Sequence, residues 1–180
     1  QKYFSETSAA IPEASLDSVT FGIAKDHYMQ KDCANAIPAF DKYISKFPDG
    51  IFSLQANFYR AQCEMKSTNT AEALIGYNFV IGKNKNDFTE QSLLNAGTIN
   101  FQQKNYSAAF DDYNKLETDA ENPANNLTAP IGQLRCAMSL KNYPAAQQAA
   151  NKVISAETAD KDVVNEAHLD LANINLQNEQ

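Results

Sequence analysis

The sequence has few of the features that mark a nucleic-acid binder or a membrane-spanning protein. It carries 15 Lys and Arg against 22 Asp and Glu, a net charge of −7, so it has too few cations to attract a phosphate backbone. No apolar run approaches the roughly 20 residues that cross a bilayer, and we expect no direct membrane insertion. With only 6 Gly and 6 Pro and 43% apolar residues, the chain is predicted to be globular rather than collagenous or linker-like.

Histidine and cysteine are also sparse. His27 and His168 are far apart and neither lies in a zinc-like or catalytic-triad pattern, so we expect structural or surface roles for both and no cofactor or metal. Cys33, Cys63 and Cys136 include no Cys-x-x-Cys pair, and we expect inert buried thiols. A bridge from Cys63 to Cys136 is disfavoured, because a whole repeat would separate the two residues.

The densest acidic cluster is Asp111, Asp112 and Glu117. Paired carboxylates perform acid–base chemistry only where an enclosing pocket shifts one pKa, and a solvated outer helix face is the expected setting here. Because the sequence also shows no nucleophile with a base and no phosphate-binding glycine loop, we predict that the protein is not an enzyme.

The chain starts with Gln1-Lys2-Tyr3-Phe4, which is neither a signal peptide nor an initiating Met. We therefore expect a soluble piece of a longer protein. Residues 1–15 show no periodic pattern and are predicted to be a linker or the end of an upstream element.

An internal repeat dominates the rest of the sequence. A small residue is followed four positions later by an aromatic or small residue in Ala36 and Phe40, Ala73 and Tyr77, Ala109 and Tyr113, and Ala146 and Ala150, at steps of 37, 36 and 37. Polar turn residues precede each pair. Upstream of each turn lies an apolar–small–apolar triplet at helical spacing: Phe21, Ala24, Tyr28; Phe58, Ala61, Met65; Leu94, Gly97, Phe101; Ile131, Leu134, Met138; and Leu169, Ala172, Leu176.

This periodicity predicts an all-α chain of antiparallel helix hairpins. The repeats span about 17–52, 53–89, 90–126 and 127–159, and a half repeat at 160–178 supplies one extra helix. Residues 16–180 thus form one repeat domain. Pro38, Pro130 and Pro144 are predicted to lie in first helical turns, where proline is tolerated.

The repeat resembles the tetratricopeptide repeat. Ala24, Ala36, Phe40, Tyr43 and Pro48 match the family's small, Ala, aromatic, apolar and Pro positions in the first repeat. The second repeat offers Ala61, Ala73, Tyr77 and Val80, and the third Gly97, Ala109, Tyr113 and Leu116. The period departs from the family's 34 residues. The resemblance implies a right-handed superhelix, an α-solenoid, of about four repeats plus one helix.

In that family the opening helix of each hairpin lines a concave surface. The resemblance implies a groove for a peptide or protein segment, lined by Phe21, Lys25, Tyr28, Phe58, Gln62, Met65, Leu94, Thr98, Phe101, Ile131, Arg135 and Met138. The alternative is that this apolar ladder is simply packing between neighbouring opening helices.

Three functions stay open on the sequence alone. The leading hypothesis is a non-enzymatic interaction scaffold that binds a protein partner in the groove. The second is a structural spacer or an oligomerisation module that self-associates through the terminal half repeat, whose helix has no following partner. The third, a small-molecule or enzyme domain, has no motif to support it.

The segment 40–50, Phe40-Asp41-Lys42-Tyr43 through Gly50, is similar in style to bacterial cell-envelope tetratricopeptide proteins, namely the Tol-Pal-associated protein and outer-membrane assembly lipoproteins. That similarity implies a periplasmic or outer-membrane-associated location.

Overall fold

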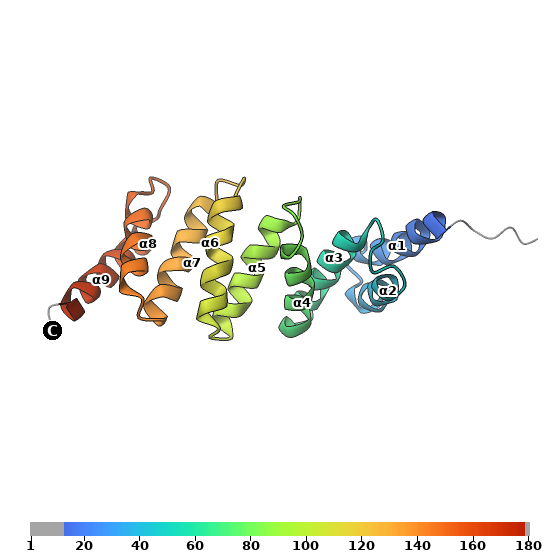
Figure 1. Cartoon of the computed structure of the whole chain (residues 1–180), viewed down its shortest axis with the longest axis horizontal. Coiled ribbons are helices and arrows are strands. Elements are labelled where there is room, and N and C mark those ends of the chain that lie inside the picture. Colours follow the sequence, from blue (N-terminus) through green and yellow to red (C-terminus); the bar gives the residue numbers. More distant parts are fainter. Residues whose placement is uncertain (1–12, 179–180) are drawn as a thin grey trace, which may run out of the picture. The chain divides into compact units, whose positions relative to one another are not determined.

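The computed structural model describes residues 13–178, and these residues form nine α-helices and no strand (Figure 1). The helices are α1 (Glu13–Met29), α2 (Cys33–Lys46), α3 (Ser53–Lys66), α4 (Thr70–Ile81), α5 (Thr89–Gln102), α6 (Tyr106–Asp119), α7 (Asn125–Ser139), α8 (Tyr143–Ser155) and α9 (Lys161–Asn178). The prediction of an all-α chain of helix hairpins is confirmed, including the extra helix at its end. The architecture is that of a helical-repeat solenoid.

One turn geometry joins the two helices of every hairpin. The turn residue has a positive φ although it is not glycine, at Lys31 (61°), Thr68 (60°), Lys104 (64°) and Lys141 (55°). The next residue donates its N–H to the carbonyl five positions back, as from Asn105 to Asn100 at 2.8 Å. These bonds form the Schellman motif, which satisfies the last carbonyls of the first helix. The side chain of Asp32 then accepts the N–H of Asn35 and caps the N-terminus of α2.

Two compact units make up the described chain, and the division falls inside α4, after Ala73. In the first unit, α1 packs on α2 and α3, and α2 packs on α3. Aromatic rings fill its core: Phe21 stacks on Phe52 with ring centroids 4.4 Å apart, and Phe40 and Tyr43 are fully buried. The hydroxyl of Tyr43 donates to buried Asp17 at 2.7 Å, which anchors α1 to α2.

The cysteines correct a prediction. Cys33 and Cys63 form a disulfide, with their Cα atoms 5.2 Å apart, whereas inert thiols were expected. The bond is possible because Cys33 is the first residue of α2 and α3 packs against that helix. Cys136 alone is a free, buried thiol as expected, and burial raises its pKa to about 12.

A second feature of the first unit is a network around one cation on α3. Arg60 donates from Nε to Asp41 of α2 and from a terminal nitrogen to Glu72 of α4, the latter at 2.9 Å. Buried Glu64, one turn further along α3, lies 3.7 Å from the same guanidinium. Arg60 is itself mostly buried, and its bonds to the carboxylates of Asp41 and Glu72 link α3 to α2 and α4.

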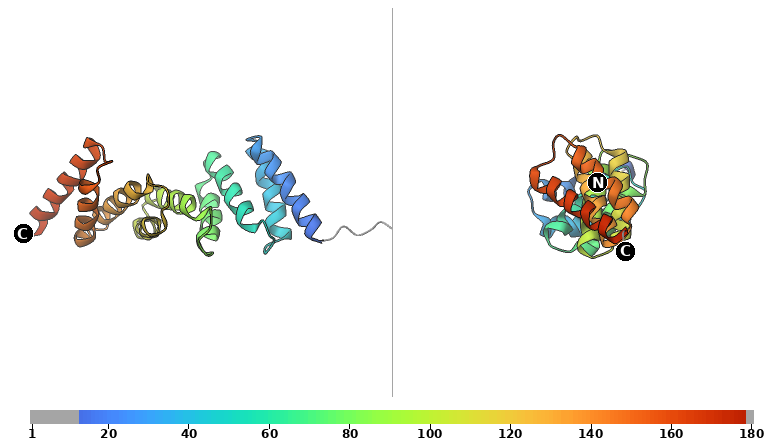
Figure 2. Two further views of the ribbon diagram at one scale, coloured as in Figure 1. Left: turned by 90° about the horizontal axis from the view of Figure 1, so that it is seen from above. Right: turned by 90° about the vertical axis from the view of Figure 1, so that its left-hand side faces the viewer.

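In the second unit, α5 packs on α6, α6 on α7, α7 on α8 and α8 on α9, so that each helix lies beside the next (Figures 1 and 2). Small residues allow this close approach, and four alanines of α8 and α9 are buried: Ala146, Ala149, Ala150 and Ala167. A neighbouring core of Leu93, Ala109, Tyr113, Leu116, Ala129 and Cys136 joins α5, α6 and α7.

Some predicted boundaries need correction. Helix α1 begins at Glu13, so the end of the segment predicted as a linker is helical, while residues 1–12 lie outside the described residues. Pro38 and Pro130 lie inside α2 and α7 rather than in their first turns, because both helices begin earlier than expected. Pro144 lies in the first turn of α8 as predicted.

Candidate partner-binding cavity between α5 and α7

A cavity of about 240 Å³ lies in the second unit, where α5 and α7 face each other above α6. Its apolar walls come from Phe101 of α5 and Ile131 of α7, and polar side chains surround them. The lining residues are Thr98, Phe101, Gln102, Tyr113, Thr128, Ile131, Gly132 and Arg135. An apolar hollow with a few polar groups is the usual character of a binding site, and this one has room for a single large side chain.

Tyr113 of α6 closes the cavity floor between two glycines. A Cβ atom at Gly132 would lie 2.5 Å from the Tyr113 ring, and one at Gly97 would lie 3.1 Å from it. The phenol hydroxyl lies 3.5 Å from Thr98 Oγ1, and burial raises the pKa of Tyr113. Two side-chain-free positions therefore let an aromatic ring approach both opening helices, and the hydroxyl faces the cavity as a neutral hydrogen-bonding group.

The corresponding place in the first unit is filled. Tyr59 occupies on α3 the repeat position that Gly132 occupies on α7, and its ring stacks on Tyr28 of α1 with centroids 4.5 Å apart. Lys66 lies over the Tyr28 ring. At this position of the repeat α3 carries an aromatic ring, whereas α7 has a glycine that lines the cavity.

One edge of the cavity is charged. Arg135 of α7 donates two hydrogen bonds to Glu166 of α9, from Nε at 2.8 Å and from a terminal nitrogen at 2.7 Å. These bonds hold the pKa of Glu166 below its ordinary value. The pair is about half exposed, so a ligand can reach it, but Arg135 is already neutralised within the chain.

The predicted groove residues fall into two groups. Phe21 and Phe58 are only 5% and 8% exposed, so these two side chains belong to the packed interior and present almost no surface to a partner. The others are half-buried or exposed: Lys25, Tyr28, Gln62, Met65, Leu94, Thr98, Phe101, Ile131, Arg135 and Met138.

Four of the predicted residues come together in the cavity: Thr98, Phe101, Ile131 and Arg135. The sequence reasoning missed Gln102, Tyr113, Thr128 and Gly132 as lining residues. Gly132 follows Ile131 directly, and a glycine beside a predicted groove residue was the available signal. Tyr113 was identified only as a packing aromatic of the second helix.

The two histidines and the acidic cluster noted in the sequence have ordinary structural roles. His168 is exposed, and His27 is partly exposed and lies 3.6 Å from Asp32. Asp111 is exposed as expected, but Asp112 corrects the expectation of a solvated face, since it is 8% exposed and accepts a hydrogen bond from Asn100 at 2.8 Å. Burial raises the pKa of Asp112. Glu117 pairs with Lys152 at 2.7 Å.

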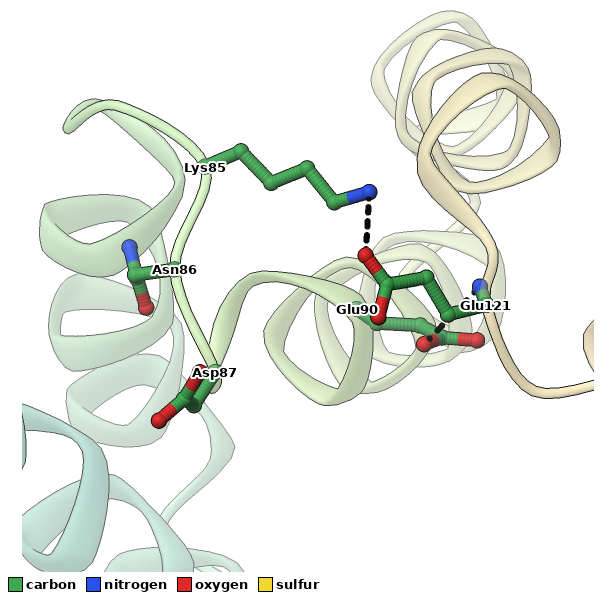
Figure 3. A pocket seen from close by; sticks show the side chains of 5 residues that line it. All are labelled: Lys85, Asn86, Asp87, Glu90 and Glu121. Atoms are coloured by element: carbon green, nitrogen blue, oxygen red, sulfur yellow. Dashed lines mark hydrogen bonds and ion pairs between the residues drawn. The ribbon is translucent and has the colours of Figure 1, made fainter.

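A polar hollow of about 270 Å³ lies in the second unit between the loop before α5 and the loop after α6 (Figure 3). Glu90 of α5 accepts the N–H group of Glu121 at 3.3 Å, and Lys85 pairs with Glu121 at 2.7 Å (Figure 3). Glu90 also accepts the N–H group of Asn122 at 3.0 Å. These charged groups already bind one another, so they hold the two loops together around the hollow.

In the first unit, a hollow of about 410 Å³ lies beside the loop between α2 and α3. The carboxylate of Asp17 on its wall accepts bonds from Tyr43 and from the N–H of Ile51. These bonds fix the loop. Because the carboxylate in this hollow is already bonded within the chain, the α5–α7 cavity is the stronger candidate site.

None of the helices in 13–178 combines the length and apolarity that a bilayer crossing requires. Within the same residues, no three His, Cys, Asp or Glu side chains gather as metal ligands would.

Comparison with known proteins finds a family match to the first hairpin and solved structures with the same fold. The tetratricopeptide-repeat family model matches residues 19–50, which are the first hairpin. The first hairpin thus matches one tetratricopeptide repeat, and the fold of the described residues is that of tetratricopeptide-repeat solenoids. A search of curated proteins finds no match.

Three solved structures share the fold. A tetratricopeptide repeat protein from Parabacteroides merdae is 20% identical with a TM-score of 0.67 over 89% of this chain, which spans 60% of that protein's length. The MamA protein is 16% identical, with a TM-score of 0.69 over 91% of this chain and 85% of its own. A putative kinesin light chain with nearly identical repeats, from Podosopora anserina, is 13% identical, with a TM-score of 0.57 over 94% and 90%.

Proposed function

We propose that the chain is an interaction scaffold that binds a peptide segment of a partner protein through the α5–α7 cavity. The observation that carries this proposal is the cavity itself, with Phe101 and Ile131 as walls and Tyr113 as floor. A single apolar side chain of the partner fills it. Gln102, Thr98 and Thr128 at its border provide hydrogen bonds for the partner's backbone.

The test uses a variant that blocks the cavity without changing the core. Gln102 is exposed and lines the cavity, so an indole in Gln102→Trp can turn into it, and the chain has no other Trp. Gln147→Trp, at an exposed position of α8 away from the cavity, is the matched control. Peptides are selected from a random phage-displayed library on the unmodified protein and titrated against both variants.

We expect enrichment of peptides with one large apolar residue, at least tenfold weaker binding to Gln102→Trp, and unchanged binding to Gln147→Trp. Fluorescence gives an independent check, since emission of the Gln102→Trp indole should be blue-shifted relative to the control. Selected peptides that bind both variants equally would show that the cavity is not the site.

A second candidate function is self-association through α9. Leu169 and Leu176 are 63% and 60% exposed, whereas their counterparts on α7, Ile131 and Met138, pack against the core shared with α8. We propose a second copy of the chain as the occupant of this face. Light scattering tests it, because Leu169→Glu should abolish concentration-dependent dimerisation, and a monomer at millimolar concentration would exclude it.

We also propose that the chain works in an oxidising compartment, in keeping with a cell-envelope location. The Cys33–Cys63 disulfide supports this, because such bonds persist in the periplasm and outside cells but rarely in the cytosol. Alkylation of thiols in intact cells before lysis tests it. Protection of Cys33 and Cys63 from the reagent is expected, and labelling of both would refute it.

A further inference from the structure

The pair of helices α7 and α9 holds, one repeat further along the chain, the place that the pair α5 and α7 holds at the cavity. Glu166 and Asp170 occupy on α9 the repeat positions that Thr128 and Gly132 occupy on α7, one step further along the chain. Helices α7 and α9 contact each other as α5 and α7 do. A partner that follows the opening helices past the cavity therefore meets two carboxylates next.

The charges at this second place do not balance. Arg135 engages Glu166 through both hydrogen bonds and leaves Asp170 with no hydrogen bond or ion pair among the described residues. Asp170 is half-buried beside them, and burial and the nearby Glu166 raise its pKa although the Arg135 charge partly opposes them. The three side chains together carry one uncompensated negative charge that is partly shielded from water.

The geometry points to a partner segment in which a basic residue lies two or three positions from the apolar residue that enters the cavity. Its cation binds Asp170 at the side of the Arg135–Glu166 pair. This inference rests on the proposed function, because the apolar residue fixes the register of the segment.

The spacing follows from helix and strand dimensions. Neighbouring packed helices lie about 8–10 Å apart, and an extended chain advances about 3.3 Å per residue. The side chain that reaches Asp170 therefore lies two or three positions along the segment from the side chain in the cavity. A partner cation also suits the net charge of −7 on this chain.

Three labelled peptides provide the test: Ser-Phe-Ser-Arg-Ser, the same peptide with Gln for Arg, and the Arg peptide with Ser for Phe. Binding is titrated by NMR shift perturbation at low and high salt. We expect the Arg peptide to bind about fivefold more tightly than the Gln peptide at low salt, in line with a partly exposed ion pair, and the advantage to shrink with added salt.

Asp170→Asn should remove the preference for Arg and leave the Gln peptide unaffected. Asp162→Asn, which removes an exposed acid from the first turn of the same helix, should change neither. Phe-dependent binding without an Arg preference, or a preference that survives Asp170→Asn, would overturn this inference alone. Failure of Phe to improve on Ser would overturn the proposed function and this inference with it.

Discussion

Reduction of the Cys33–Cys63 disulfide should destabilise the first unit specifically. The bond links residues separated by 30 positions, and closing a loop of that length removes roughly 12 cal/mol/K of entropy from the unfolded chain. At 25 °C this corresponds to roughly 3.6 kcal/mol of stability. Amides of α1–α3 that exchange through opening of the unit should therefore exchange a few hundred times faster after reduction.

Hydrogen-exchange mass spectrometry with and without a reductant measures the effect helix by helix. The variant Cys136→Ala provides the control, because it removes the thiol that is free and should leave the response of α1–α3 to reduction intact. Thiol titration of the unreduced protein in urea should give one equivalent. Three equivalents, or unchanged exchange in α1–α3 after reduction, would refute the reasoning.

Three further substitutions test the packing. Gly132→Ala places a methyl group 2.5 Å from the Tyr113 ring. The cost of this overpacking should exceed the roughly 1 kcal/mol gained in helix propensity, so urea unfolding should show a net loss of about 1–2 kcal/mol in stability. An unchanged unfolding midpoint would mean that the ring moves aside freely. Arg60→Met should cost about 2 kcal/mol by leaving three carboxylates without their cation, and a neutral result would contradict the network. Asp112→Asn should stabilise at pH 7, because the folded-state pKa of Asp112 is raised. Above that pKa the native state of the unmodified protein carries the cost of an ionised buried acid. The greater stability of Asp112→Asn should therefore disappear as the pH falls through that pKa. A stability gain that does not depend on pH would count against this explanation.

The repeat pattern of the sequence predicted the helices well, because the spacing of apolar residues shows which side of each helix is buried, and this is a local property. It could not predict the disulfide. Comparing equivalent repeat positions drew attention to Cys63 and Cys136, whereas the real partner, Cys33, lies at a different position of the neighbouring helix. Contacts between helices depend on how their side chains pack against one another, and the repeat spacing gives no information on that packing.

The candidate site was predicted in part for a similar reason. Thr98, Phe101, Ile131 and Arg135 follow from the repeat positions, but the cavity that joins them depends on Gly132 and on the Tyr113 ring behind it. The charge of Arg135 also changed meaning. The sequence predicts it only as a cation of the groove lining, whereas its bonds to Glu166 neutralise it and leave the uncompensated charge on Asp170.

The four hairpin turns are positions where glycine substitutions should raise the thermal stability of the protein. Lys31, Thr68, Lys104 and Lys141 each adopt a left-handed conformation that costs an ordinary residue about 1 kcal/mol and glycine none. All four are exposed and none lines the α5–α7 cavity. Since they lie one to a repeat, glycine at each should add its gain independently. The protein could thus be made more heat-resistant in graded steps while the lining of the α5–α7 cavity is left unchanged.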